Sequence, residues 1–179
     1  MPEATATATA DAGATVAMLS GLGRLSLRGA PPVLAAAGVA LGLRLPEQAC
    51  RAQEGDGCAA LWLSPDEQLL LLQQSEWDDV LAALTLALKG MPHSLVDISQ
   101  RQIALQISGA GSAQLLSAGC PLDLHPQAFP AGMCTRTLFA KAPIVLWRTA
   151  LDAFHLEVWR SFAPYVQQLL REVAREFEQ

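Results

Sequence analysis

The stretch Leu25-Ser-Leu-Arg-Gly-Ala30 is matched in pattern by Leu105-Gln-Ile-Ser-Gly-Ala110. In both, apolar and polar residues alternate, and a glycine follows at Gly29 or Gly109. Such alternation is typical of a half-buried strand, and the glycine indicates a turn after it. The same strand-and-turn unit therefore occurs twice, which indicates an internal duplication.

The segments that follow the two glycines extend the match. A short helix is expected over Pro31 to Ala37 and over Ser112 to Ala118. Proline suits a first helical turn, where its missing N–H has no partner to lose. Gly38 and Gly119 are placed to end these helices.

Each half then continues with a strand pair, in which we align Trp62 with Trp147. An amphipathic helix closes each half, around residues 77–88 and 162–177. A further strand is available at Leu95 to Ile98.

This order of elements is that of split βαβ, ferredoxin-like units. We therefore predict an α+β fold made of two tandem ferredoxin-like repeats, about residues 21–91 and 92–179, in a single domain over 21–179. The Ala/Thr-rich residues 1–20 are interpreted as a disordered, solvated tail.

Composition narrows the function classes. About half of the 179 residues are apolar, enough for a sizeable core. The net charge of −5 argues against nucleic-acid binding. No segment approaches the roughly 18 uninterrupted apolar residues of a membrane span, so we expect no membrane association. The N-terminus does not resemble a secretory signal, so we predict a cytoplasmic protein with four free thiols, at Cys50, Cys58, Cys120 and Cys134.

The sequence motifs of common active sites are missing. There is no dinucleotide-binding G-x-G-x-x-G after a strand, no phosphate-binding Walker A loop and no H-E-x-x-H. Cys120 and His125 lack the further residues that thiol catalysis or metal binding needs, and the neighbouring prolines indicate a rigid connector. We predict no catalytic, cofactor-binding or metal-binding residue in this chain.

Four residues are candidates for contact with a partner: Asp97, Phe129, Met133 and Arg136. Asp97 could contact a partner or act as a base, but capping a turn is its simpler role, since no general acid is nearby. The connector, residues 120–137, is apolar and irregular, and such a segment is costly to expose. It either folds over its own core or is covered by a partner, and we favour the partner because aromatic residues and Arg are enriched at interfaces. Arg136 could pair with a partner carboxylate or remain a solvated surface residue.

Several runs occur in a characteristic order: Leu95-Val-Asp-Ile-Ser-Gln-Arg101, Gly119-Cys-Pro-Leu-Asp-Leu124, Cys134-Thr-Arg-Thr-Leu138 and Arg160-Ser-Phe-Ala-Pro-Tyr165. In this order and spacing the sequence resembles the sarcosine oxidase gamma subunit family. The likeness extends from about Leu22 to Phe177 and is strongest after Leu95.

The resemblance implies a place in an enzyme of four unlike subunits. That enzyme oxidises sarcosine to glycine and yields hydrogen peroxide with formaldehyde or, when tetrahydrofolate is present, methylenetetrahydrofolate. The resemblance implies alpha, beta and delta subunits as partners, and FAD, FMN, NAD and tetrahydrofolate in those partners rather than in this chain. It also implies a fold related to the folate-binding aminomethyltransferases.

We therefore expect a non-catalytic gamma subunit that supports assembly of the oxidase. One alternative is a stand-alone folate-binding or one-carbon transfer protein, with Asp97 as the carboxylate for the pterin. A second alternative is an assembly chaperone.

Overall fold

The computed structural model describes residues 4–10 and 13–176, which form two compact units. The first unit spans Gly21–Ser99, and the second contains the chain from Gln100 onward together with the N-terminal strands. The two units correspond to the two repeats expected within a single domain over residues 21–179, and their union in one domain stays a prediction. The boundary at residue 91 moves to Ser99, because the strand at 93–97 adds to the first sheet.

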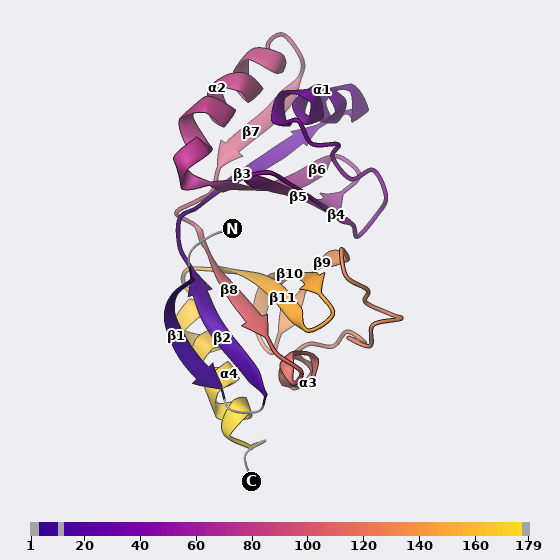
Figure 1. Ribbon diagram of the computed structural model, residues 1–179. Coiled ribbons are helices and arrows are strands. Elements are labelled where there is room, and N and C mark those ends of the chain that lie inside the picture. Colours follow the sequence, from indigo (N-terminus) through magenta and orange to yellow (C-terminus); the bar gives the residue numbers. More distant parts are fainter. Residues whose placement is uncertain (1–3, 11–12, 177–179) are drawn as a thin grey trace. The chain divides into compact units, whose positions relative to one another are not determined.

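The first unit is a ferredoxin-like sheet covered by two helices (Figure 1). Its sheet has the order β4-β5-β6-β3-β7, and every neighbouring pair is antiparallel. Short β4 lies at one edge, and the other four strands have the ferredoxin-like order. The elements are β3 (Leu22–Gly29), α1 (Pro31–Leu41), β4 (Ala52–Gly55), β5 (Cys58–Ser64), β6 (Glu67–Gln73), a 3-10 turn (Gln74–Glu76), α2 (Trp77–Ala87) and β7 (His93–Asp97).

The second unit repeats this arrangement with one strand exchanged. Its sheet has the order β1-β2-β8-β11-β10-β9, so β9, β10, β11 and β8 correspond to β4, β5, β6 and β3. In the first sheet, β7 pairs with β3. In the second sheet, β2 takes the corresponding place and pairs with β8, also antiparallel. The elements are β1 (Ala4–Ala10), β2 (Ala14–Leu19), β8 (Gln102–Ser108), α3 (Ser112–Ser117), β9 (Cys134–Phe139), β10 (Ala142–Ala150), β11 (Ala153–Trp159) and α4 (Ala163–Glu176). The expected α+β fold of two ferredoxin-like repeats is confirmed.

The expectation of a disordered tail over residues 1–20 is wrong where the structure describes this segment. β1 and β2 are strands of the second sheet, and Ala14 and Val16 are buried in the core of that unit. The alternating Ala and Thr residues of β1 suit a pleated strand, because small and β-branched residues fit a pleated surface. Residues 1–3 and 11–12 lie outside the described residues.

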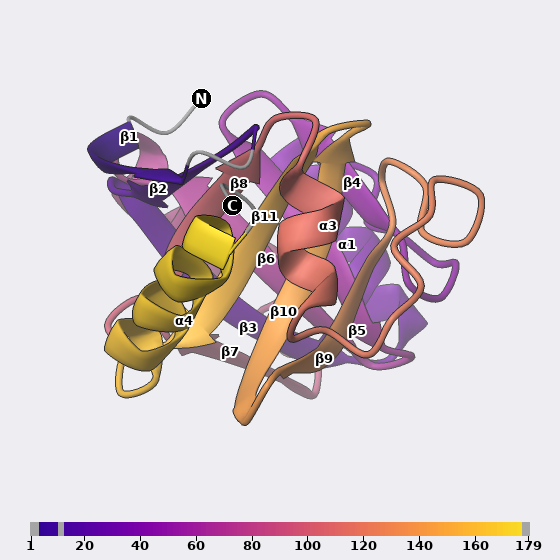
Figure 2. The same cartoon turned by 90° about the horizontal axis from the view of Figure 1, so that it is seen from below.

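In each unit the helices cover one face of the sheet. Val33 of α1 and Leu84 of α2 enter the first core, and Leu115 of α3 and Val166 of α4 enter the second. Figure 2 shows α3 and α4 lying on the face formed by β8, β11 and β10. No helix in residues 4–10 and 13–176 is long and apolar enough to cross a membrane.

Helix α1 begins at Pro31 as expected but does not end at Gly38. It continues to Leu41, and Gly42 ends it in the left-handed conformation, with φ 61°. Gly38 has a packing role instead, because a Cβ there would lie 2.9 Å from the carbonyl oxygen of Leu43. The glycine allows the loop after the helix to approach the helix closely.

The alignment of Trp62 with Trp147 is also wrong. Trp62 lies on the helix-covered face of its sheet, the face of Ala60, whereas Trp147 alternates with the core residue Leu146 and lies on the other face. The partner of Trp62 on β6 is Gln68, and the equivalent pair in the second unit is Arg148 with Phe154. A shift of one residue in a strand moves each side chain to the opposite face of the sheet, so aligning the two tryptophans gave the wrong register.

Candidate functional site

A buried arginine organises the connector of the second unit. Arg148 is only 2% exposed, although it carries a charge. Its Nη1 donates to the carbonyl oxygens of Leu124 (2.9 Å) and Phe129 (2.8 Å), and its Nε donates to that of Leu151 (3.0 Å). The guanidinium carbon lies 4.8 Å from the centroid of the Phe154 ring. Carbonyl dipoles and the aromatic face offset the cost of burying the charge.

Arg148 therefore joins the connector to the β10–β11 hairpin. Strand β10 presents Ile144, Leu146 and Arg148 to the helix-covered core, since alternate residues of a strand share a face. Sequence reasoning overlooked Arg148. Arg148 stands two residues after Leu146 in an apolar strand, so strand alternation places both on the core-facing side. This spacing was the feature of the sequence that could have identified Arg148.

The connector folds over its own core. Leu124 and Phe129 are 3% and 2% exposed, and Met133 packs against the same core while partly exposed. The backbone N–H groups of Ala128 and Phe129 both donate to the His125 carbonyl oxygen. Phe129 is removed from the interface candidates because its side chain is not accessible. The preference for a partner over the exposed part of this stretch stays a prediction.

The structure does not bring Cys120 and His125 together. The Cys120 sulfur is buried and lies 4.0 Å from the Thr137 hydroxyl. His125 is exposed, and its Nδ1 accepts a hydrogen bond from the backbone N–H of Gln127 at 3.3 Å. His125 thus belongs to a turn that shapes the connector.

Strand β9 carries the accessible part of the predicted interface. It forms an edge of the second sheet, and its Arg136 and Leu138 are both exposed. The two residues share a face, since they are two positions apart, and Leu138 is 46% exposed. At such an edge, a partner strand can form backbone hydrogen bonds with β9, contact Leu138 and place a carboxylate beside Arg136.

Asp97 lies at the end of β7, exposed on the edge of the first sheet. Its Oδ1 accepts the backbone N–H of Ser99 at 2.8 Å, and the Ser99 hydroxyl accepts the backbone N–H of Arg24 at 2.8 Å. Asp97 therefore caps a turn, as its simpler interpretation predicted. It belongs to the first unit, whereas the connector belongs to the second.

A second buried polar pair lies on the other face of the second sheet. His155 and Glu157 share a face of β11, and the His155 Nε2 lies 2.7 Å from the Glu157 Oε1. The Trp147 ring lies 5.7 Å from that of His155, between ring centroids. The two polar residues stand two positions apart in an apolar strand, and this spacing was the feature of the sequence that could have identified the pair. The His155 Nε2 and the Glu157 Oε1 are partners of each other.

Comparison with known proteins gives consistent results. The model of the sarcosine oxidase, gamma subunit family matches residues 28–176. The sarcosine oxidase subunit gamma of Corynebacterium sp. (strain P-1) is 33% identical over 144 residues, 80% of this chain and 70% of the relative. That of an Arthrobacter species is 34% identical over the same shares.

Solved structures show the same relationship. A chain of heterotetrameric sarcosine oxidase from Corynebacterium sp. U-96, in complex with pyrrole 2-carboxylate, is 31% identical with a TM-score of 0.87. The match covers 93% of this chain and 86% of that one. Aminomethyltransferase T of the Bartonella henselae glycine cleavage system is 12% identical with a TM-score of 0.63, over 86% of this chain and 44% of that one. This second likeness shows a shared fold.

Proposed function

Because the chain belongs to the sarcosine oxidase gamma subunit family, we propose that it is a non-catalytic subunit that supports assembly of a heterotetrameric sarcosine oxidase. The observation that carries the proposal is the likeness to a chain of such a heterotetramer, which extends over both units. The partners are the alpha, beta and delta subunits. They hold the FAD, FMN, NAD and tetrahydrofolate.

In this proposal the assembled complex oxidises sarcosine to glycine and reduces oxygen to hydrogen peroxide. The methyl carbon leaves as formaldehyde or as methylenetetrahydrofolate. This chain contributes surface, and its accessible candidates are Arg136 with Leu138 on β9, partly exposed Met133, and Asp97 on β7. Arg136 carries most of the expected contact, because a guanidinium can pair with a partner carboxylate through two parallel hydrogen bonds.

No observation favours the stand-alone folate-binding or one-carbon transfer protein. That alternative used Asp97 as a pterin-binding carboxylate, and this carboxylate is exposed at a sheet edge and already accepts a backbone hydrogen bond.

The variant Arg136→Ala tests the proposal. We expect it to weaken complex formation by about 1–3 kcal/mol, as for a truncated interfacial charge, and to leave the melting temperature of the free chain nearly unchanged. Arg171→Ala, an exposed arginine of α4, is the matched control and should assemble normally. Co-purification with the other subunits measures the first effect and thermal melting the second. Normal assembly of Arg136→Ala would remove Arg136 from the interface.

A further inference from the structure

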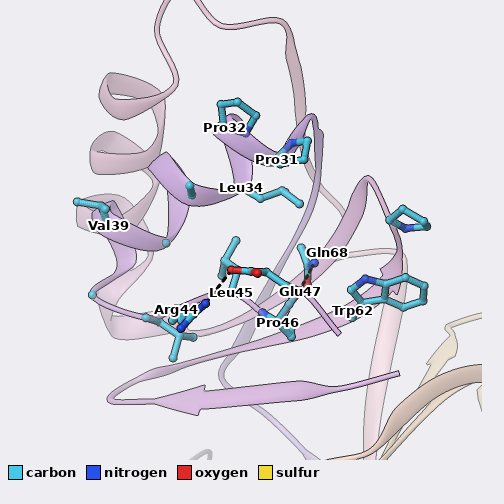
Figure 3. A pocket seen from close by; sticks show the side chains of 15 residues that line it. Pro31, Pro32, Leu34, Val39, Arg44, Leu45, Pro46, Glu47, Trp62 and Gln68 are labelled. Atoms are coloured by element: carbon cyan, nitrogen blue, oxygen red, sulfur yellow. Dashed lines mark hydrogen bonds and ion pairs between the residues drawn. The ribbon is translucent and has the colours of Figure 1, made fainter. Parts of the chain in front are cut away.

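A groove of about 840 Å³ opens within the first unit, between α1, the loop after it and the β5–β6 hairpin (Figure 3). Pro31, Leu34, Leu45 and Trp62 contribute to its apolar walls. Small-molecule sites have this size, a mainly apolar lining and a few polar groups that fix orientation.

One of those polar groups is Gln68, which lines the groove and is fully buried. Its Nε2 donates to the Pro46 carbonyl oxygen at 3.0 Å. That carbonyl can only accept, so the bond determines which end of the amide is the nitrogen. The Oε1 is buried, and no group among residues 4–10 and 13–176 donates to it. A buried acceptor without a donor costs stability, which a donor from a ligand would restore.

The second unit shows what fills the equivalent place there. Its Arg148–Phe154 pair lies as far from its hairpin turn as the Trp62–Gln68 pair lies from the turn of the first unit. In the second unit the connector packs Leu124 and Phe129 into the core beside Arg148 and gives it two carbonyl partners. The loop at this position in the first unit, residues 42–51, is shorter than residues 118–133 and leaves the groove open.

The charges at the groove favour a neutral occupant. Arg44 and Glu47 both line it, and the Arg44 Nη2 lies 3.1 Å from the Glu47 Oε1. Figure 3 shows this ion pair beside the groove. Because the two side chains offset each other, neither sign of ligand charge is selected.

We infer that this groove binds a small, neutral, planar aromatic molecule that carries a ring N–H. The ring takes the place that the Phe129 side chain takes in the second unit, and the ring N–H donates to the Gln68 Oε1. This inference does not depend on the proposed role in assembly.

Two probes that differ by one hydrogen-bond donor test the inference. Indole has a ring N–H, and 1-methylindole has the same ring without it. Titrations of the full chain, followed by ¹H–¹⁵N NMR, should show saturable shifts at Trp62 and its neighbours with indole. Binding of 1-methylindole should be roughly tenfold weaker, the value of one hydrogen bond to a buried acceptor. Equal affinities, absence of saturable shifts, or shifts centred on Trp159 of the second unit would overturn the inference.

Two variants locate the site. Ala35→Trp places a large side chain at the groove from an exposed position of α1 and should abolish indole binding. Ala118→Trp, exposed in the second unit, is the control and should bind indole normally. Gln68→Leu should give the two probes equal affinity. If this variant does not fold, the Ala35→Trp result and the two probes on the unaltered chain still decide. Unchanged binding in Ala35→Trp would contradict the site.

Discussion

Replacing Arg148 by methionine, which has a similar length and no donor, should destabilise the second unit. The change leaves the carbonyl oxygens of Leu124 and Phe129 without their guanidinium donor, and both of these hydrogen bonds are buried. A buried acceptor that loses its donor costs about 1–3 kcal/mol, so two of them, at the middle of this range, predict a loss of about 4 kcal/mol. Removing the buried charge recovers part of the cost of its desolvation, which lowers the expectation to about 2–4 kcal/mol.

Thermal melting measures this loss directly. For a chain of this size, 1 kcal/mol shifts the melting temperature by about 2–4 °C. At about 3 kcal/mol, the middle of the expected loss, Arg148→Met should melt roughly 6–12 °C below the unaltered protein. Amide hydrogen exchange should show that the Ala128 and Phe129 N–H groups lose protection first, because the connector is released from the hairpin. Arg148→Lys should be intermediate, since an ammonium group cannot span carbonyls on both sides.

The exposed arginine of α4 supplies the control: Arg171→Met should melt within about 2 °C of the unaltered chain, as surface substitutions usually do. If Arg148→Met melted equally close to it and the connector amides kept their protection, the role assigned to Arg148 would be wrong.

Three further predictions concern other parts of the chain. Gly109→Ala should destabilise by roughly 2–4 kcal/mol, because φ is +113° and the added Cβ would clash with the Gly13 carbonyl oxygen. Gly132→Ala, with φ +81° and open space around the added Cβ, should cost only about 1 kcal/mol in the same thermal melts. The hydrogen bond from the Ser64 hydroxyl is the main cause that lowers the pKa of Asp66 below 3.8, so Ser64→Ala should raise that pKa in an NMR titration, and an unchanged pKa would contradict this cause. Because the pKa is lowered on folding, this bond stabilises the folded chain above pH 3.8, and the stabilisation is lost as the pH falls through the folded-state pKa. Thiol titration of the denatured, unreduced chain should count all four cysteines, and a disulfide would refute this. In the folded chain, Cys58 should react with iodoacetamide more slowly than Cys50, because burial and then Glu76 and Asp56 raise the pKa of the Cys58 thiol; faster reaction of Cys58 would contradict this.

Local patterns in the sequence were enough for the architecture of the two repeats. The alternation before Gly29 and Gly109 identified β3 and β8, because a strand that is buried on one face must alternate. The apolar stripes identified α2 and α4 for the corresponding reason in a helix. These features depend on residues within a few positions of each other, so they are readable without knowing the contacts.

Features set by distant pairing were not readable in this way. β2 is a strand because it pairs with β8, and the Ala/Thr-rich segment that leads into it resembles a solvated tail when read alone. Strand register is also set by distant pairing. Trp62 and Trp147 look equivalent in the sequence, but their positions differ by one residue in register, so they lie on opposite faces of their sheets.

The candidate interface shows the same limit. Phe129 and Met133 are apolar residues in an irregular segment, and composition alone could not tell a core from a partner surface. The deciding contacts come from Arg148, whose carbonyl partners Leu124 and Phe129 lie on a different segment of the chain. Arg136 and Asp97 are exposed, as an interface requires, and their role remains a prediction.

Co-expression of this chain with the alpha, beta and delta subunits of a sarcosine oxidase tests the central claim most directly. The account predicts that the chain co-purifies with them in fixed stoichiometry, that flavin absorbance accompanies the complex, and that the chain purified alone has no flavin spectrum and no bound metal. A chain that elutes alone from the co-expressed subunits, or one that carries stoichiometric flavin or zinc by itself, would contradict a non-catalytic role in assembly.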